Sequence, residues 1–194
     1  MAISSLSTSS MVSGVKRRKI WDQSATTDGF FQIATTTLNT AAASIEFNSI
    51  PQTYTHLQIR AIGRSTSTSP DTYLQINGVT AGGNYSYHYV YGDGASVASG
   101  SDTSQGFLIG LRTATSNNSA NIFGVGVIDI LDYTNTNKFK TVRTLSGFDG
   151  NGSGLTWLVS GNYRSTNAIT SLKFTASSVS FAQYSSFDLY GIKG

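Results

Sequence analysis

The amino-acid sequence predicts an all-β protein: a single jelly-roll-like antiparallel β-sandwich over residues 30–194, with an extended N-terminal arm over residues 1–29. The first observation is composition. Charged residues make up 12% of the 194 residues, about half of the usual share, and Ser, Thr, Asn and 20 Gly replace them. Helix surfaces are normally built from Glu, Lys and Arg, whereas Thr and Ser suit solvated strand faces and Gly and Asn suit turns. The second observation is a series of about ten short alternating apolar segments, which favours a sandwich or jelly roll.

The arm is the first element, and it differs in composition from the rest. A Ser-rich stretch over residues 1–14 precedes a basic and apolar cluster: Lys16, Arg17, Arg18, Lys19, Ile20 and Trp21. Outside this cluster the chain has nine basic and ten acidic residues, a net charge of −1. The high isoelectric point therefore comes from the arm, and we expect no nucleic-acid partner. Two interpretations stay open: a solvated terminus, or an arm that orders against a neighbouring subunit or particle protein with Ile20 and Trp21 as anchors.

The strands follow from alternation. Residues 56–61 place Leu57, Ile59 and Ala61 on one face, and residues 73–76 alternate before Asn77-Gly78, a typical two-residue hairpin signal. Further strands are expected where apolar residues alternate with polar ones, at residues 155–160, 172–175 and 187–190.

Two segments depart from simple alternation. Residues 122–131 are apolar on both faces, which predicts a strand at the centre of packed sheets, with Gly124 and Gly126 allowing close approach or a bulge. Residues 92–106 are rich in Gly, Ser and Asp and read as a long loop, either mobile decoration or a binding surface.

Catalytic and ligand sites find little support, and we expect no enzyme, no metal and no cofactor. Glu46 is the only glutamate, and His56 and His88 are the only histidines, so we expect the histidines to be ordinary sheet residues. Asp129 and Asp132 are three apart in a strand-like segment, which places them on opposite faces rather than as a catalytic pair. Residues 149–154 resemble the start of a calcium loop, but the bidentate Glu at its twelfth position is missing, so a hairpin turn is favoured.

A run of tyrosines is the most suggestive local feature. Tyr85, Tyr87, Tyr89 and Tyr91 are two apart, so a strand would place all four rings on one face. One interpretation is a tyrosine ladder at the edge of the core or at a subunit contact; the other is a flat aromatic surface for a glycan or partner. No basic residues alternate with these rings, which argues against single-stranded nucleic acid.

Several blocks of the chain resemble a family of small virion structural proteins of tailed bacteriophages. They are SGVKRRKIWDQSA in the arm, SIPQTYTHLQIRAIGR at 49–64, NYSYHYVYGDG at 84–94, VIDILDYTNTNKFKTVRTLSGFDGNGSG at 127–154 and the terminal SSFDLYGIKG. The resemblance spans nearly the whole chain. It implies a structural role in the virion and supplies no catalytic residues.

The leading hypothesis is a capsid decoration, or cement, protein that is made in the host cytoplasm and joins the virion. It would associate with itself, as a trimer, and the arm residues 16–21 would grip the major capsid protein or a neighbouring subunit. The alternative is a tail fibre or other tail-associated protein that binds host surface glycan through Tyr85–Tyr91 and residues 92–106. A third hypothesis, a carbohydrate-binding module outside any virus, is disfavoured because no secretion signal is evident, and no stretch is apolar enough for a membrane span.

Overall fold

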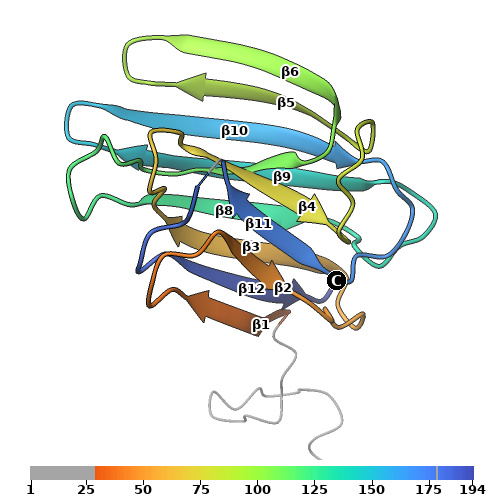
Figure 1. Cartoon of the computed structure of the whole chain (residues 1–194). Coiled ribbons are helices and arrows are strands. Elements are labelled where there is room, and N and C mark those ends of the chain that lie inside the picture. Colours follow the sequence, from red (N-terminus) through yellow and green to blue (C-terminus); the bar gives the residue numbers. More distant parts are fainter. Residues whose placement is uncertain (1–28, 178) are drawn as a thin grey trace, which may run out of the picture.

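The computed structural model describes residues 29–177 and 179–194, which form two antiparallel β-sheets, as predicted (Figure 1). The strands are β1 (Phe30–Thr37), β2 (Ser44–Phe47), β3 (His56–Gly63), β4 (Asp71–Ile76), β5 (Tyr85–Gly92), β6 (Val97–Gln105), β7 (Leu108–Arg112), β8 (Gly124–Ile130), β9 (Lys140–Asp149), β10 (Gly154–Tyr163), β11 (Leu172–Ala176) and β12 (Ser186–Ile192). Within these two ranges no helix has the length and apolar character needed to cross a membrane.

The order of the strands is that of a jelly roll with two additions. The larger sheet runs β1-β12-β3-β8-β9-β10-β5-β6, and the smaller runs β2-β11-β4-β7. The jelly roll consists of β1, β3, β8 and β12 in the larger sheet and of β2, β4, β7 and β11 in the smaller one, so that β12 lies between β1 and β3 while β11 lies between β2 and β4. This is the double Greek key of a jelly roll. The hairpins β5–β6 and β9–β10 are insertions that widen the larger sheet beyond β8.

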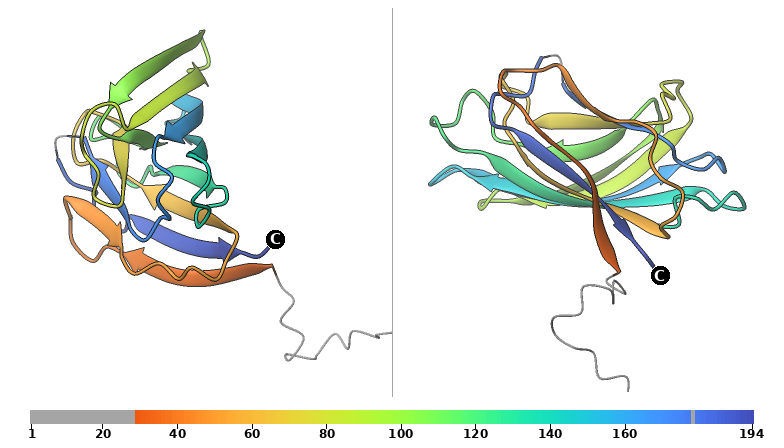
Figure 2. Two further views of the ribbon diagram at one scale, coloured as in Figure 1. Left: turned by 90° about the vertical axis from the view of Figure 1, so that its right-hand side faces the viewer. Right: turned by 90° about the horizontal axis from the view of Figure 1, so that it is seen from below.

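The core lies between the sheets, because the smaller sheet covers one side of the larger (Figure 2). The alternation predicted for β3 is confirmed: Leu57 and Ile59 are fully buried and face this layer. Phe187 on β12 meets Phe174 on β11, with ring centroids 5.1 Å apart, and this contact joins the two sheets. The sandwich is therefore held by apolar side chains supplied alternately from each strand.

The glycines of β8 allow close approach, as their place in an apolar segment predicted. Strand β7 contacts β8, β9 and β10 from the smaller sheet. A Cβ at Gly124 would lie 2.8 Å from the Thr113 Cα, and a Cβ at Gly126 would collide with the Leu111 side chain. Larger residues at these two positions would push the edge of the smaller sheet away from the larger sheet.

Two expectations about individual segments were wrong. Residues 92–106 are not a long loop: most of them form β6, which pairs with β5 around a turn where Asp93 Oδ1 accepts hydrogen bonds from the N–H groups of Ala95 and Ser96. Strand β8 is central within its sheet, but only one of its faces is covered, and Val125 is 58% exposed. The two errors have different causes: the polar composition of β6 resembles that of a loop although the strand pairs with the neighbouring β5, whereas the covering of β8 depends on strands that are distant in sequence.

Candidate functional site

The outer face of the larger sheet carries a row of aliphatic side chains. Strand register places Val127 opposite Leu145, Leu145 opposite Leu158, and Leu158 opposite Val90, with Ile62 opposite Val125 in the next row. Leu145 is 54% exposed, and the other members are exposed or half-buried. We call these six residues the apolar stripe: Ile62, Val90, Val125, Val127, Leu145 and Leu158. Among residues 29–177 and 179–194, no strand of the smaller sheet packs on this side.

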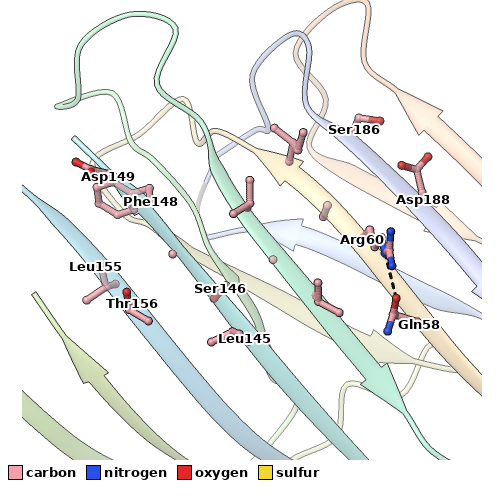
Figure 3. A pocket seen from close by; sticks show the side chains of 16 residues that line it. Gln58, Arg60, Leu145, Ser146, Phe148, Asp149, Leu155, Thr156, Ser186 and Asp188 are labelled. Carbon is pink, nitrogen blue, oxygen red and sulfur yellow. Dashed lines mark hydrogen bonds between the residues drawn. The ribbon is translucent and has the colours of Figure 1, made fainter. Parts of the chain in front are cut away.

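A depression of about 850 Å³ is hollowed into this face (Figure 3). Its floor includes stripe residues from β3, β8 and β9, and its sides are formed by β12 and β10. The labelled side chains of Arg60, Gln58 and Asp188 lie on one side of it, and those of Phe148, Leu155 and Thr156 lie on the other. We call it the sheet-face depression. Its lining residues are Gln58, Arg60, Ala61, Ile62, Val125, Gly126, Val127, Leu145, Ser146, Gly147, Phe148, Asp149, Leu155, Thr156, Ser186 and Asp188.

The polar side chains around the apolar stripe form hydrogen bonds with one another and with neighbouring side chains. Arg60 Nε donates to Gln58 Oε1 (3.1 Å), and Gln58 Nε2 donates to Asp129 Oδ1 (2.8 Å). The Thr35 hydroxyl donates to Asp188 Oδ1. The Arg60 guanidinium also lies over the Phe30 ring, 5.2 Å from its centroid. An apolar centre within a polar rim is the usual anatomy of a protein–protein contact.

The predicted docking residues of the arm, Lys16, Arg17, Arg18, Lys19, Ile20 and Trp21, lie outside the residues that the structure describes.

The four tyrosines of β5 face the core side of the larger sheet. Tyr85 is 0% exposed and Tyr87 is 5% exposed, whereas Tyr89 and Tyr91 are half-buried near the sheet edge. The Tyr87 hydroxyl donates a hydrogen bond to Asp102 Oδ2 (2.9 Å). The Tyr85 hydroxyl accepts a hydrogen bond from the Ile76 backbone N–H (2.9 Å). This arrangement is a ladder at the edge of the core. A flat ligand could reach the exposed edges of Tyr89 and Tyr91 but not the two buried rings.

Trp157 extends this aromatic cluster from β10. Its ring stacks with Tyr89 (centroids 4.4 Å apart) and with Tyr91 (4.8 Å). The Arg112 guanidinium lies over the indole, 4.0 Å from its centroid, and its Nε is 2.5 Å from Asp71 Oδ1. Burial raises the pKa of the Asp71 carboxyl, and the charge of Arg112 opposes that rise. The tyrosine ladder is thus fixed to the smaller sheet through one stacked cation.

Alkaline pH should destabilise the protein through these buried hydroxyls. Burial raises the pKa of Tyr85 to about 12, and burial and the Asp102 carboxylate also raise the pKa of Tyr87. Above pH 10 the unfolded chain loses these protons while the folded chain keeps them, so the free energy of unfolding falls by about 1.4 kcal/mol per pH unit for each such tyrosine. Urea unfolding across this pH range should show a shallower fall for Tyr85→Phe than for Tyr184→Phe, whose ring is 67% exposed. Equal slopes in the two variants would contradict the assignment.

The two histidines lie on different strands, and His56 contacts one of the two aspartates that were considered for catalysis, with its Nδ1 3.5 Å from Asp132 Oδ1. His56 is in β3, where its Nδ1 accepts a hydrogen bond from the Asp132 N–H (2.9 Å), and His88 is in β5, opposite Ser101 and Ser160. The Asp132 carboxylate pairs with Lys138. In the described part of the chain no three His, Asp or Glu side chains gather in a way that could hold a metal ion.

The calcium-like segment is a hairpin turn between β9 and β10, as favoured from the sequence. Asn151 and Gly152 have φ angles of 56° and 101°, and the Gly150 N–H donates to the Ser153 carbonyl (2.6 Å). The Asp149 carboxylate accepts a hydrogen bond from the Asn151 N–H (2.8 Å). These bonds account for the composition of the segment.

Two cationic side chains, the buried Lys140 and the half-buried Arg64, stabilise loops. Lys140 is fully buried, and its Nζ donates to the carbonyls of Asn135, Lys138 (3.1 Å) and Thr166 (3.1 Å). Burial lowers its pKa. The Arg64 guanidinium donates to the carbonyls of Asn118, Ser119 and Ile122. Both side chains serve the fold, because each replaces water around carbonyl groups of a loop.

The sequence interpretation missed the sheet-face depression. The sequence does contain a pattern that indicates it, because three strands carry apolar side chains on both faces. The apolar residues that alternate with buried ones are Val125 and Val127 in β8, Leu145 in β9 and Leu158 in β10. Such strands indicate either burial on both sides or an uncovered apolar face, and only the width of the smaller sheet distinguishes the two. Comparison of the chain with protein-family models, with curated protein sequences and with solved structures finds no match.

Proposed function

We propose that this chain is a non-enzymatic structural protein of a bacteriophage particle, a capsid decoration protein that associates with itself. The observation that carries the proposal is the apolar stripe on the outer face of a jelly roll. Jelly rolls are a common architecture of viral capsid domains, and an exposed apolar patch on a β-sheet marks a contact surface. The family resemblance of the sequence points in the same direction.

The proposed occupant of the sheet-face depression is the arm of a neighbouring subunit, with Ile20 and Trp21 in the apolar centre. The chemistry of the two partners matches. The lining offers Ile62, Val125 and Leu145 to apolar side chains. It also carries the carboxylates of Asp149 and Asp188 against one guanidinium, that of Arg60, so its excess charge is opposite to that of Lys16–Lys19.

The length of the arm is sufficient for this contact. The described part of the chain enters β1 at Phe30, at an edge of the larger sheet, with Trp21 nine residues earlier. Nine residues span up to about 30 Å when extended. Strand β8 is three inter-strand spacings from β1, about 15 Å, so an arm of this length can cross a sheet edge and reach the face of an adjacent copy.

An arm that docks on the face of the next subunit makes a head-to-tail contact, and such contacts form a ring when the rotation between subunits closes. The proposed ring is a trimer, with the Ser-rich residues 1–14 left to meet the major capsid protein. This geometry gives each subunit one arm to donate and one face to receive.

The test is complementation between two variants of the full protein. Deletion of residues 1–21 removes the arm, and Leu145→Asp places a charge in the depression; each variant alone is expected to be monomeric by light scattering and not to attach to particles. A mixture of the two should form hetero-dimers, because the Leu145→Asp chain still donates an arm and the deleted chain still offers a face. Val97→Asp, at an exposed valine of β6 (78% exposed), is the matched control and should assemble normally.

Other outcomes would overturn parts of the proposal. A mixture that forms no hetero-dimer would overturn the docking of the arm on the sheet-face depression. Normal particle attachment by the deleted chain would reject the arm as the anchor. Copy number separates the two locations: copies in proportion to the major capsid protein support the capsid role, and a small fixed number per virion supports the tail-associated alternative.

A further inference from the structure

We propose that Asn151 is a site of spontaneous deamidation and that Asn77, although it also precedes a glycine, is not. Both Asn-Gly pairs lie in tight turns in which both residues have a positive φ. The φ angles are 56° at Asn151 and 53° at Asn77, and each following glycine also has a positive φ. The dipeptide and the turn are therefore shared, and any difference in reactivity comes from what holds the side chain.

The reaction needs no enzyme and no oxidant. The backbone nitrogen of the glycine loses its proton and attacks the asparagine Cγ, and ammonia leaves from Cγ as a five-membered succinimide forms. Water then opens the ring at either carbonyl and yields aspartate or isoaspartate. Glycine favours the attack because no Cβ crowds its nitrogen. The asparagine amide must be free to rotate until its Cγ faces that nitrogen.

The amide of Asn77 is held on both sides by the loop before β11. Its Nδ2 donates to the Ala168 carbonyl (2.8 Å), and its Oδ1 accepts from the Thr170 N–H (2.8 Å) and the Ser171 N–H (3.2 Å). The Thr170 hydroxyl adds a fourth contact at 3.3 Å. Attack on Cγ would require the amide to rotate and all four of these contacts to break, which adds to the barrier of the reaction.

The amide of Asn151 has no such contacts. The residue is exposed, and within residues 29–177 and 179–194 its side chain makes no hydrogen bond; its backbone N–H alone is engaged, by the Asp149 carboxylate. In the same part of the chain the Gly152 N–H makes no backbone hydrogen bond. Both reacting groups are therefore free to meet.

The product would change the end of the strands that carry the apolar stripe. Either product adds a carboxylate two residues from Asp149, which lines the sheet-face depression. Isoaspartate also inserts a methylene into the backbone of the turn that joins β9 and β10. Deamidation of Asn151 would thus slowly change the charge and the backbone of the turn beside the sheet-face depression.

The test is peptide mapping by mass spectrometry after incubation of the full folded chain at mildly alkaline pH and body temperature. The mass gained when an amide becomes an acid should accumulate at Asn151 at least about tenfold faster than at Asn77, because only Asn77 must first break its hydrogen bonds. In concentrated urea the two sites should react at similar rates, which makes each molecule its own control. Asn151→Gln should remove the fast reaction.

Equal rates at the two sites in the folded chain would overturn the inference, because the hydrogen bonds of Asn77 would then have no protective effect. An Asn151 that stays intact in the folded chain while it reacts in urea would also overturn it, since the turn itself would then be protective.

Discussion

Phe187→Ala is expected to lower the free energy of unfolding by about 3–5 kcal/mol, the usual cost of deleting a fully buried phenylalanine ring. Phe187 is 0% exposed and projects from β12 between the two sheets. Its ring meets Phe174 of β11 at 5.1 Å and Phe181 at 5.2 Å, centroid to centroid. Alanine would leave a cavity where the two sheets touch, and the surrounding strands can close it only in part.

Urea unfolding at neutral pH measures this loss. Phe139→Ala is the matched control, because it removes the same side chain from a position that is 48% exposed, and it should change stability by less than about 1 kcal/mol. A loss of similar size in both variants would show that the contact between Phe174 and Phe187 does not hold the sheets together.

Arg112→Met is expected to cost about 2–3 kcal/mol at neutral pH. The substitution removes the partner of a mostly buried carboxylate and uncovers an aromatic ring. Arg112 pairs with Asp71 and stacks on Trp157, and the two paired side chains are only 22% and 24% exposed. Because both side chains are partly exposed, the expected loss of unfolding free energy is smaller than that for breaking a fully buried ion pair.

The cost should depend on pH with a definite sign. Burial raises the pKa of Asp71 even beside Arg112, and without Arg112 that pKa rises further. As the pH falls toward this raised value, the folded chain takes up a proton before the unfolded chain does, so folding is favoured and the deficit of the variant shrinks. Unfolding free energies at neutral and mildly acidic pH should therefore converge for the variant and the unsubstituted chain.

Lys173→Met provides the comparison for this pair. Lys173 pairs with Glu46 at 2.8 Å, but both side chains are more than 40% exposed, and exposed pairs contribute about 0–1 kcal/mol. A deficit for Arg112→Met no larger than that of Lys173→Met, or one that grows on acidification, would contradict the role given to Asp71.

The apolar alternation of individual strands was predictable from the sequence. Leu57 and Ile59 in β3, Trp157 in β10 and Phe174 in β11 are all buried as their spacing predicted. The turn at Asn77-Gly78 was predictable as well, because its positive φ angles depend on the two residues themselves. The hairpin expected there was wrong, because β4 and β5 on its two sides belong to different sheets. The β5 tyrosines lie on one face, as predicted. Their burial agrees with a tyrosine ladder at the edge of the core, the first of the two interpretations of this run.

The edge strand and the candidate site were not predictable in the same way. Strand β6 has a Ser-, Gly- and Asp-rich sequence that resembles a loop, and it is extended because β5 offers it hydrogen bonds. Val125 and Leu145 have the spacing of core residues, yet they are exposed because the four strands of the smaller sheet cover only one side of the eight-stranded sheet.

The sequence by itself therefore determined the all-β class, the alternation within each strand and the tight turns, because these depend on residues close together along the chain. Tertiary structure alone decided the jelly-roll order and the exposure of the apolar stripe. Whether an apolar face is core or contact surface depends on what packs against it, and that partner comes from distant parts of this chain or from another chain.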